Sequence, residues 1–138
     1  MVVSLSVRNI IRPIVSLDRN SNTMEGANKM MEENIGSIVV SDSGNYVGIV
    51  TERDLVKKVI ALGKDPNRTT LGEIMTSPLV TIEADRGLGE ATSLMLQRGI
   101  RRLVAVDKGK ILGIFTQRDL QQKVDEVFRS LAEVQQLG

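Results

Sequence analysis

The sequence predicts an α/β (α+β) fold in which two β-α-β-β-α repeats pack as a pseudo-two-fold pair. The clearest observation is a duplicated segment, which reads GIVTERDL at residues 48–55 and GIFTQRDL at residues 113–120, with six of eight residues identical. In both copies an apolar strand pattern changes to a helical pattern at the threonine. A repeat of this length is too short to bury its own helices and strands, so we expect the two copies to pack together.

Each repeat is expected to begin with a short strand after a proline and to continue with an amphipathic helix. The strands are expected at residues 14–17 and 79–82, and the helices at residues 27–35 and 88–100, where apolar residues recur at helical spacing. A glycine lies near the end of each helix, where a left-handed cap is common. These glycines are Gly36 and Gly99.

A hairpin is expected after each of these helices. Its strands are expected at residues 38–40 and 46–50 in the first repeat, and at residues 103–106 and 111–115 in the second. Between the strands, the chain reads Ser-Gly-Asn in one repeat and Lys-Gly-Lys in the other, and glycine in so short a connection favours a tight hairpin turn.

The duplicated segment then begins the last helix of each repeat. Thr51 and Thr116 are expected at the N-cap, and Asp54 and Asp119 at the third helical position. A hydroxyl at the cap and a carboxylate three residues later satisfy the exposed amides and the positive end of a helix. Both pairs therefore predict a helix start whether or not they also bind a ligand.

By this pattern the repeats span residues 7–62 and 71–127, with a loop-forming linker at residues 63–70 and a helical extension at residues 128–138. The last helix carries a heptad-like apolar stripe: Leu120, Val124, Val127, Leu131 and Val134. Such a stripe either covers the edge of its own repeat or contacts a second copy of the chain. Five positions are too few for a self-standing coiled coil, so both interpretations stay open.

The amino-acid composition limits the catalytic and binding chemistry that the chain can perform. The net charge is +1, which gives no overall field toward nucleic acid or membrane, and there is neither cysteine nor histidine. No glycine-rich phosphate loop or metal-ligand motif is present, so we expect no enzyme, no cofactor and no metal. The N-terminus lacks the features of a signal peptide and no stretch reaches transmembrane length, which favours a cytoplasmic protein.

The chain resembles a tandem pair of cystathionine β-synthase (CBS) domains, a Bateman module, here as a standalone protein. The resemblance rests on the two Gly-x-x-Thr-x-x-Asp segments, on Ile74–Pro78 and on Gly99–Leu103, and it extends over nearly the whole chain. It implies a regulatory, energy-sensing module that binds AMP, ADP, ATP or an adenosyl compound such as S-adenosylmethionine in the clefts between the repeats. It also implies a homodimer that signals to an unidentified partner.

The resemblance assigns Asp54 and Asp119 to the ribose, since one carboxylate accepts hydrogen bonds from both the 2′ and 3′ hydroxyls. Thr51 and Thr116 are candidates to offer hydroxyls to phosphate or ribose. The competing interpretation is that both Thr…Asp pairs are only helix caps.

Arg101 and Arg102 lie where related modules carry phosphate ligands, and guanidinium groups suit that role. The competing interpretation is a solvated pair at the edge of the repeat. The matching positions of the first repeat are Gly36 and Ser37, which carry no charge, so we expect two unequal sites. Arg118 is a weaker candidate, because the second helical position can face either solvent or a cleft. The resemblance places the following residues near the adenine ring: Ser16, Val80, Thr81, Ile82 and Ile100. The competing interpretation is that each is a plain core residue.

Two other functions compete with ligand sensing. One is a ligand-independent structural or partner-docking dimer, for which nucleotides would leave the stability unchanged. The other is nucleic-acid binding, which the near-zero net charge and the scarcity of aromatic residues make an unfavourable interpretation.

Overall fold

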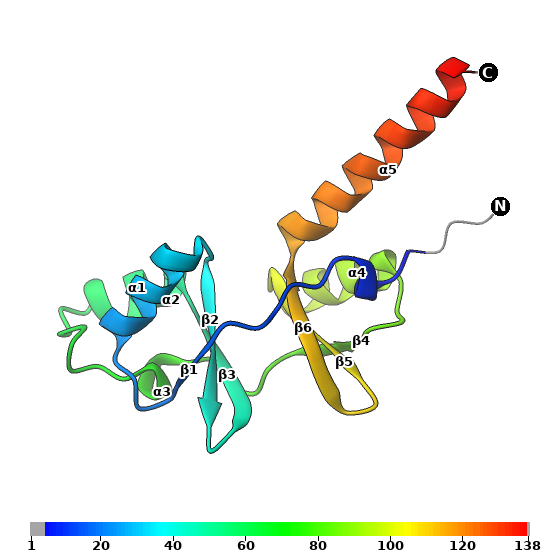
Figure 1. The fold of residues 1–138 in the computed structure, drawn as a ribbon. Helices are drawn as coiled ribbons and strands as arrows, with labels where there is room; N and C mark the ends of the chain where they lie inside the picture. The colour runs from blue at the N-terminus through cyan, green and yellow to red at the C-terminus, as the bar shows by residue number, and fades with distance from the viewer. Residues whose placement is uncertain (1–4, 138) are drawn as a thin grey trace. The chain divides into compact units, whose positions relative to one another are not determined.

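The computed structural model describes residues 5–137, so residue 138 of the expected C-terminal extension lies outside the described residues. The chain divides into two compact units. Residues 15–79 form one, the first-repeat unit, and residues 80–138 together with the N-terminal segment up to Ile14 form the other, the second-repeat unit. Each unit contains one three-stranded sheet with helices packed on it (Figure 1).

The first-repeat unit follows the predicted β-α-β-β-α order. Its elements are β1 (Ser16–Asp18), α1 (Thr23–Glu33), β2 (Ser37–Asp42), β3 (Asn45–Thr51), α2 (Glu52–Leu55), the π-helical η2 (Val56–Ile60) and the short α3 (Leu71–Ile74). In the sheet, β1 is parallel to β2 and β3 is antiparallel to β2. The π-helical continuation of α2 is not predicted from the sequence.

The second-repeat unit has the same order and pairing. Its elements are the 3₁₀ helix η1 (Val7–Asn9), β4 (Thr81–Glu83), α4 (Leu88–Arg98), β5 (Arg102–Asp107), β6 (Lys110–Thr116) and α5 (Gln117–Leu137). Here β4 is parallel to β5, and β6 is antiparallel to β5. The α/β fold class with two β-α-β-β-α repeats is therefore confirmed.

Both predicted hairpin turns are present. Ser43 and Gly44 have φ angles of 51° and 83°, and Lys108 and Gly109 have φ angles of 51° and 79°. Two successive residues with positive φ match the right-handed twist of the flanking strands. The glycine in each turn is therefore required by the backbone conformation.

Of the two predicted glycine caps, one is present in the structure and the other is not. Gly99 ends α4 in the left-handed conformation, with a φ of 63°, as predicted. The prediction of Gly36 as the cap of α1 is wrong, because the helix already ends at Asn34, which has a φ of 54°. Asparagine tolerates this conformation better than most residues, so no glycine is needed there.

Each unit has its own hydrophobic core on the helix-covered face of its sheet. The first-repeat core contains the buried residues Met30, Ile38, Val40, Val50, Val59, Leu71 and Ile74. The second-repeat core contains, among others, Ala91, Met95, Leu103, Ala105 and Phe115. Equivalent strand positions supply both cores, as the period of two predicts for a sheet covered by helices on one face.

The segment before the first strand of each repeat pairs with the sheet of the other repeat. The backbone N–H and carbonyl of Arg12 both bond to Ile114 of β6, at 2.8 and 3.0 Å. Thr76 pairs in the same way with Ile49 of β3, at 2.9 and 3.0 Å. The sequence alone does not predict this exchange, since order along the chain assigns each segment to the repeat that follows it.

Only the first turns of α5 pack against the core of their own unit. Leu120 is buried in the second-repeat core and Val124 packs against it. Phe128, Leu131 and Val134 are 68%, 55% and 65% exposed. The first half of the apolar stripe thus covers the edge of its own unit, whereas contact of the second half with another copy stays a prediction.

None of the helices within residues 5–137 is long and apolar enough to cross a membrane.

Candidate functional site

A closed hydrogen-bonded box begins the last helix of the first repeat. Asp54 Oδ2 accepts from the backbone N–H of Thr51 at 2.9 Å and from the Thr51 hydroxyl at 3.1 Å. The Asp54 N–H donates in return to Thr51 Oγ1 at 3.1 Å. The predicted capping role of this pair is confirmed.

Thr116 and Asp119 form the same box at the start of α5. Asp119 Oδ2 accepts from the Thr116 N–H at 2.9 Å and from the Thr116 hydroxyl at 3.1 Å, and the Asp119 N–H donates to Thr116 Oγ1 at 3.1 Å. Two bonds use both lone pairs of Oδ2. Any ligand contact of this carboxylate must therefore involve mainly Oδ1.

The free oxygen of Asp119 faces a cation. Arg12 Nη2 lies 2.6 Å from Asp119 Oδ1. The Asp119 side chain is only 9% exposed, whereas that of Arg12 is 61% exposed. The carboxylate is thus fixed and nearly buried, while the guanidinium stays largely in solvent.

Asp54 also faces a cation, supplied by a different element. Lys58 Nζ lies 3.3 Å from Asp54 Oδ1 and donates to the carbonyl of Ile74 at 2.9 Å. This lysine lies one turn further along the same helix, in η2. Sequence reasoning missed both Lys58 and Arg12; the i, i+4 spacing to Asp54 is the signal that indicates the lysine, and no comparable signal exists for Arg12.

The sheet register brings some of the predicted residues of the second repeat to one face. Arg102 pairs directly with Thr116, and Thr81 pairs with Val104, two residues further along β5. Paired residues and those two apart share a face of a sheet. Thr81, Arg102 and Thr116 therefore lie on the face opposite the helix-covered core.

Ile82 lies on the other face. It is 8% exposed and belongs to the core beneath α4. Ile100 is half-buried and packs against the same core, and so does Val80. The structure therefore does not place Ile82 on the same face of the sheet as Thr116.

The two remaining arginine candidates are exposed. The Arg101 carbonyl accepts from the N–H of Gln117 at 2.8 Å, which joins the start of β5 to the start of α5. Its side chain is exposed, as is that of Arg118, whereas Arg102 is half-buried. The start of β5 and the Asp119 box are thus neighbours.

The first repeat builds the same face from smaller polar residues. Ser37 pairs with Thr51, and Ser16 pairs with Val39, so Ser16, Ser37 and Thr51 share a face. The carbonyl of Gly36 accepts from the Glu52 N–H at 3.1 Å, as Arg101 does in the second repeat. The two sites are geometrically equivalent but differ in the side chains at the start of the second strand.

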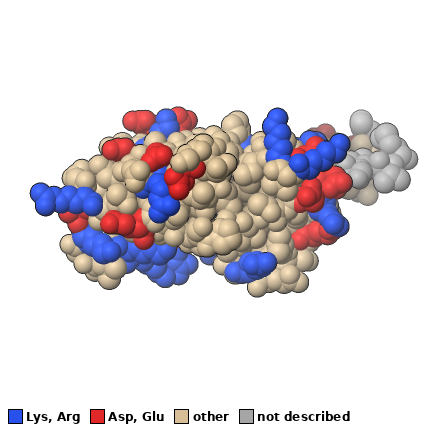
Figure 2. Space-filling view, turned by 90° about the horizontal axis from the view of Figure 1, so that it is seen from below, with Lys and Arg blue, Asp and Glu red and all other residues tan. Residues whose placement is uncertain are grey.

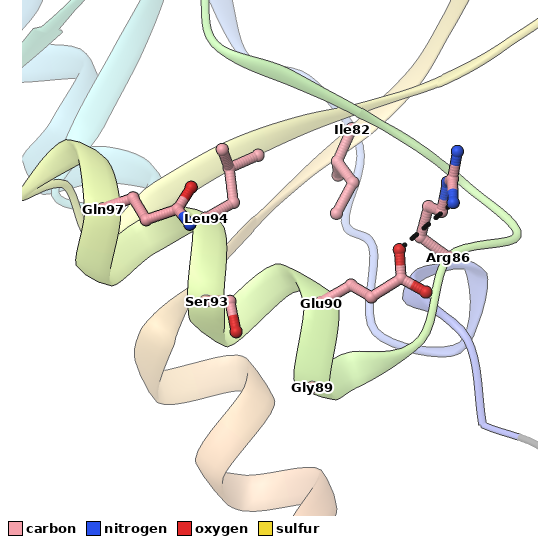
Figure 3. A pocket seen from close by; sticks show the side chains of 7 residues that line it. All are labelled: Ile82, Arg86, Gly89, Glu90, Ser93, Leu94 and Gln97. Atoms are coloured by element: carbon pink, nitrogen blue, oxygen red, sulfur yellow. Dashed lines mark hydrogen bonds and ion pairs between the residues drawn. The ribbon is translucent and has the colours of Figure 1, made fainter.

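A separate hollow of about 600 Å³ lies between α4 and the β4 end of the second-repeat unit (Figure 3). Ile82 and Leu94 give it an apolar wall, and Arg86 and Glu90 form an ion pair of 3.3 Å at its side. The other lining residues are Gly89, Ser93 and Gln97. The two ionic groups among its lining residues thus neutralise each other, and this hollow is distinct from the Asp119 box.

Charged side chains of both signs are interspersed over the face shown in Figure 2, with uncharged surface between them. Within residues 5–137 there is no cluster of three or more acidic side chains arranged to hold a metal ion. These observations do not single out a further site for nucleic acid or metal.

Comparisons with known proteins identify the repeats. The model of the CBS domain matches residues 7–61 and 71–126. An uncharacterized protein of Methanopyrus kandleri is 42% identical over 122 residues, which cover 86% of this chain. The matched region spans 62% of that relative's length. A CBS domain-containing protein of Bacillus subtilis is 34% identical over 107 residues, or 78% of this chain and 76% of that protein.

Comparison with solved structures supports the same family. A candidate signal-transduction protein with CBS domains from Burkholderia ambifaria has a TM-score of 0.83 at 30% identity, covering 87% of this chain and 93% of that one. A conserved protein from Pyrococcus horikoshii has a TM-score of 0.81 at 30% identity, covering 90% and 95%. CBS domains are non-catalytic, so the match also confirms that these repeats are not an enzyme. The chain belongs to the CBS-domain family and carries two CBS domains in tandem.

Proposed function

We propose that this CBS pair is a cytoplasmic regulatory module that binds an adenine nucleotide or a related adenosyl compound and signals the occupancy to a partner protein. The observation that carries the proposal is the duplicated carboxylate. Asp54 and Asp119 are both fixed by a cap through Oδ2, and both direct Oδ1 toward a cation rather than into the protein core.

A ribose would bond to Asp119 through Oδ1. The carboxylate cannot rotate freely, because Oδ2 is held by two hydrogen bonds from Thr116. A fixed, nearly buried acceptor loses little entropy on binding, and a charge-assisted hydrogen bond contributes about 1.5–3 kcal/mol. The Thr116 hydroxyl is already a donor to Asp119, so its role is to position the carboxylate.

We propose that the two sites are unequal. The Asp119 box is next to the start of β5, with Arg101 and Arg102, whereas the Asp54 box is next to Gly36 and Ser37. Phosphorylated ligands should therefore prefer Asp119.

A ligand-independent docking module is the second candidate, and one observation favours it. Each carboxylate already has a cation on Oδ1 and two donors on Oδ2, so neither box is incomplete without a ligand. In this function the boxes only begin the helices.

We also propose that the module forms a homodimer. Met31 of α1 and Leu96 of α4 occupy equivalent positions sixty-five residues apart and are 75% and 76% exposed. A large apolar side chain in water at the same place in both repeats favours association through these helices. Sedimentation of the Met31→Lys/Leu96→Lys variant should give a monomer where the original chain gives a dimer.

The decisive experiment is a thermal-shift titration with AMP, ADP, ATP and S-adenosylmethionine. A ligand at one hundred times its dissociation constant should add about 2.7 kcal/mol to the free energy of unfolding, which is several degrees in this size range. The test variant is Asp119→Asn, which keeps one oxygen to accept the cap hydrogen bonds but loses the charge and the second oxygen. Asp107→Asn is the matched control, because Asp107 forms an exposed ion pair with Arg8 in the same unit.

The ligand-induced shift, measured from each variant's own baseline, should disappear in Asp119→Asn and persist in Asp107→Asn. A complete absence of shifts in the original chain would instead favour the docking function.

A further inference from the structure

We propose that Arg12 is a phosphate-binding residue of the Asp119 site, beside Arg101 and Arg102, and helps that site to select phosphorylated ligands. The inference rests on the proposed function, and it names the class of ligand that the site takes. Arg12 lies more than one hundred residues before Asp119 in the chain, outside both of the duplicated segments.

The backbone holds Arg12 at the site. Its N–H and carbonyl are both bonded to Ile114, which lies two residues before Thr116 on β6. The Arg12 backbone therefore stays within side-chain reach of the Asp119 box. Of its five N–H groups, the ion pair with Asp119 Oδ1 involves only the Nη2 end, and 61% of the side chain is exposed.

Ligand binding at Asp119 should exchange one ion pair for two contacts. A ribose hydroxyl that bonds to Oδ1 competes with Arg12 Nη2 for the same oxygen, because Oδ2 has no free lone pair. If the ligand carries a phosphate, the displaced guanidinium can bind it in a bidentate manner. The charge of Arg12 then stays neutralised.

Adenosine cannot complete this exchange, because it would take Oδ1 and leave the Arg12 charge without a partner. S-adenosylmethionine offers a carboxylate that a guanidinium can bind, but its sulfonium and ammonium groups bring positive charge close to Arg12. We therefore expect AMP to bind at Asp119 more tightly than either adenosine or S-adenosylmethionine.

The Asp54 site lacks such a group. The residue before the proline of the second repeat is Ser77, whose hydroxyl donates to the carbonyl of Val47 at 2.7 Å. The cation at Asp54 is Lys58, which has already committed one of its three N–H donors to the Ile74 carbonyl. Phosphate selectivity is thus expected at Asp119 alone.

Isothermal titration of AMP and adenosine into the original chain and into Arg12→Gln tests the proposal. Loss of a charge-assisted bond should weaken AMP binding at least about tenfold. Adenosine should bind Arg12→Gln as well as or better than the original chain, because its competitor for Oδ1 is gone. Arg8→Gln is the matched control, an exposed arginine of the same segment that pairs with Asp107 at 3.4 Å, and it should change neither affinity.

The outcomes separate this inference from the proposed function. Unchanged AMP affinity in Arg12→Gln, or an equal loss for AMP and adenosine, would overturn the role of Arg12 while nucleotide binding stands. If neither AMP nor adenosine binds the original chain and the thermal-shift titration shows no ligand either, nucleotide sensing fails, and inorganic tripolyphosphate becomes the probe. Tripolyphosphate stabilisation that Arg12→Gln abolishes and Arg8→Gln retains would still support Arg12 as a phosphate ligand; stabilisation equal in all three proteins, or none, would overturn it.

Discussion

Gly113 lies directly beneath the backbone of Arg12: a β-carbon at this glycine would be 2.5 Å from the Arg12 carbonyl oxygen. Gly48 has the same relation to Thr76, with a separation of 2.8 Å. The first glycine of each duplicated segment is thus required because an exchanged segment crosses it at close range.

Gly113→Ala should destabilise the protein by about 1–3 kcal/mol, since the atom that the new methyl group meets belongs to the backbone and cannot rotate away. Urea denaturation measures the change. Gly89→Ala is the control: a β-carbon at this position of α4 would have nothing within 4 Å, and its φ is not positive, so alanine should be neutral or stabilise by up to about 1 kcal/mol. Equal effects of the two substitutions would contradict the close-contact explanation.

Thr116→Ala should cost about 1 kcal/mol, because the Asp119 N–H loses its acceptor and Asp119 Oδ2 loses a donor. Thr116→Ser keeps the hydroxyl and should stay within about 0.5 kcal/mol of the original. Thermal unfolding of both variants gives the comparison. A serine variant as unstable as the alanine variant would indicate that the threonine methyl group, not the cap, carries the effect.

Asn34→Gly should be neutral or stabilising, and Asn34→Ala should destabilise by about 1 kcal/mol, because the residue has a left-handed backbone with a φ of 54°. The two variants are compared by their free energies of unfolding in denaturant. The difference between them gives the cost of holding a residue with a β-carbon in the left-handed conformation. Alanine tolerated as well as glycine would show that α1 ends differently in solution.

Leu120→Ala should cost about 2–5 kcal/mol, since this side chain is 9% exposed within the second-repeat core. In contrast, Leu131→Lys with Val134→Lys should leave the stability of a dilute sample unchanged, because both residues are more than half exposed. Denaturation at low and high protein concentration distinguishes the two halves of α5. A concentration-dependent loss in the double lysine variant would identify the exposed half as a contact with a second copy.

The sequence predicts the repeat architecture well because local signals and long-range packing agree in it. The Thr51 and Thr116 caps, the glycines of the two hairpin turns and the period-two core positions each follow from one short stretch of chain. The duplication then supplies an independent check, since a signal present in one repeat is expected in the other.

The site is less predictable, because the cation at Asp119 comes from the other repeat. Arg12 reaches Asp119 through a strand exchange that no local propensity encodes, and residues one hundred positions apart give no periodic signal. The face of Ile82 could have been inferred from alternation with Thr81, once β4 was known to pair with β5. The asymmetry between Arg101 and Gly36 is visible in the sequence, since both positions can be aligned.

The exchanged segments also determine what happens to the fold when a protease cuts the linker between the repeats. Cleavage after the exposed Gly63 would divide the chain between the repeats, yet each fragment would leave a segment in the other's unit: residues 5–14 in the unit that contains β6, and residues 64–79 in the unit that contains β3. The nicked protein should therefore migrate as one species until denatured, and the two halves, produced separately, should recover their fold only when mixed. Cutting between the two family matches thus separates each compact unit from one of its own segments.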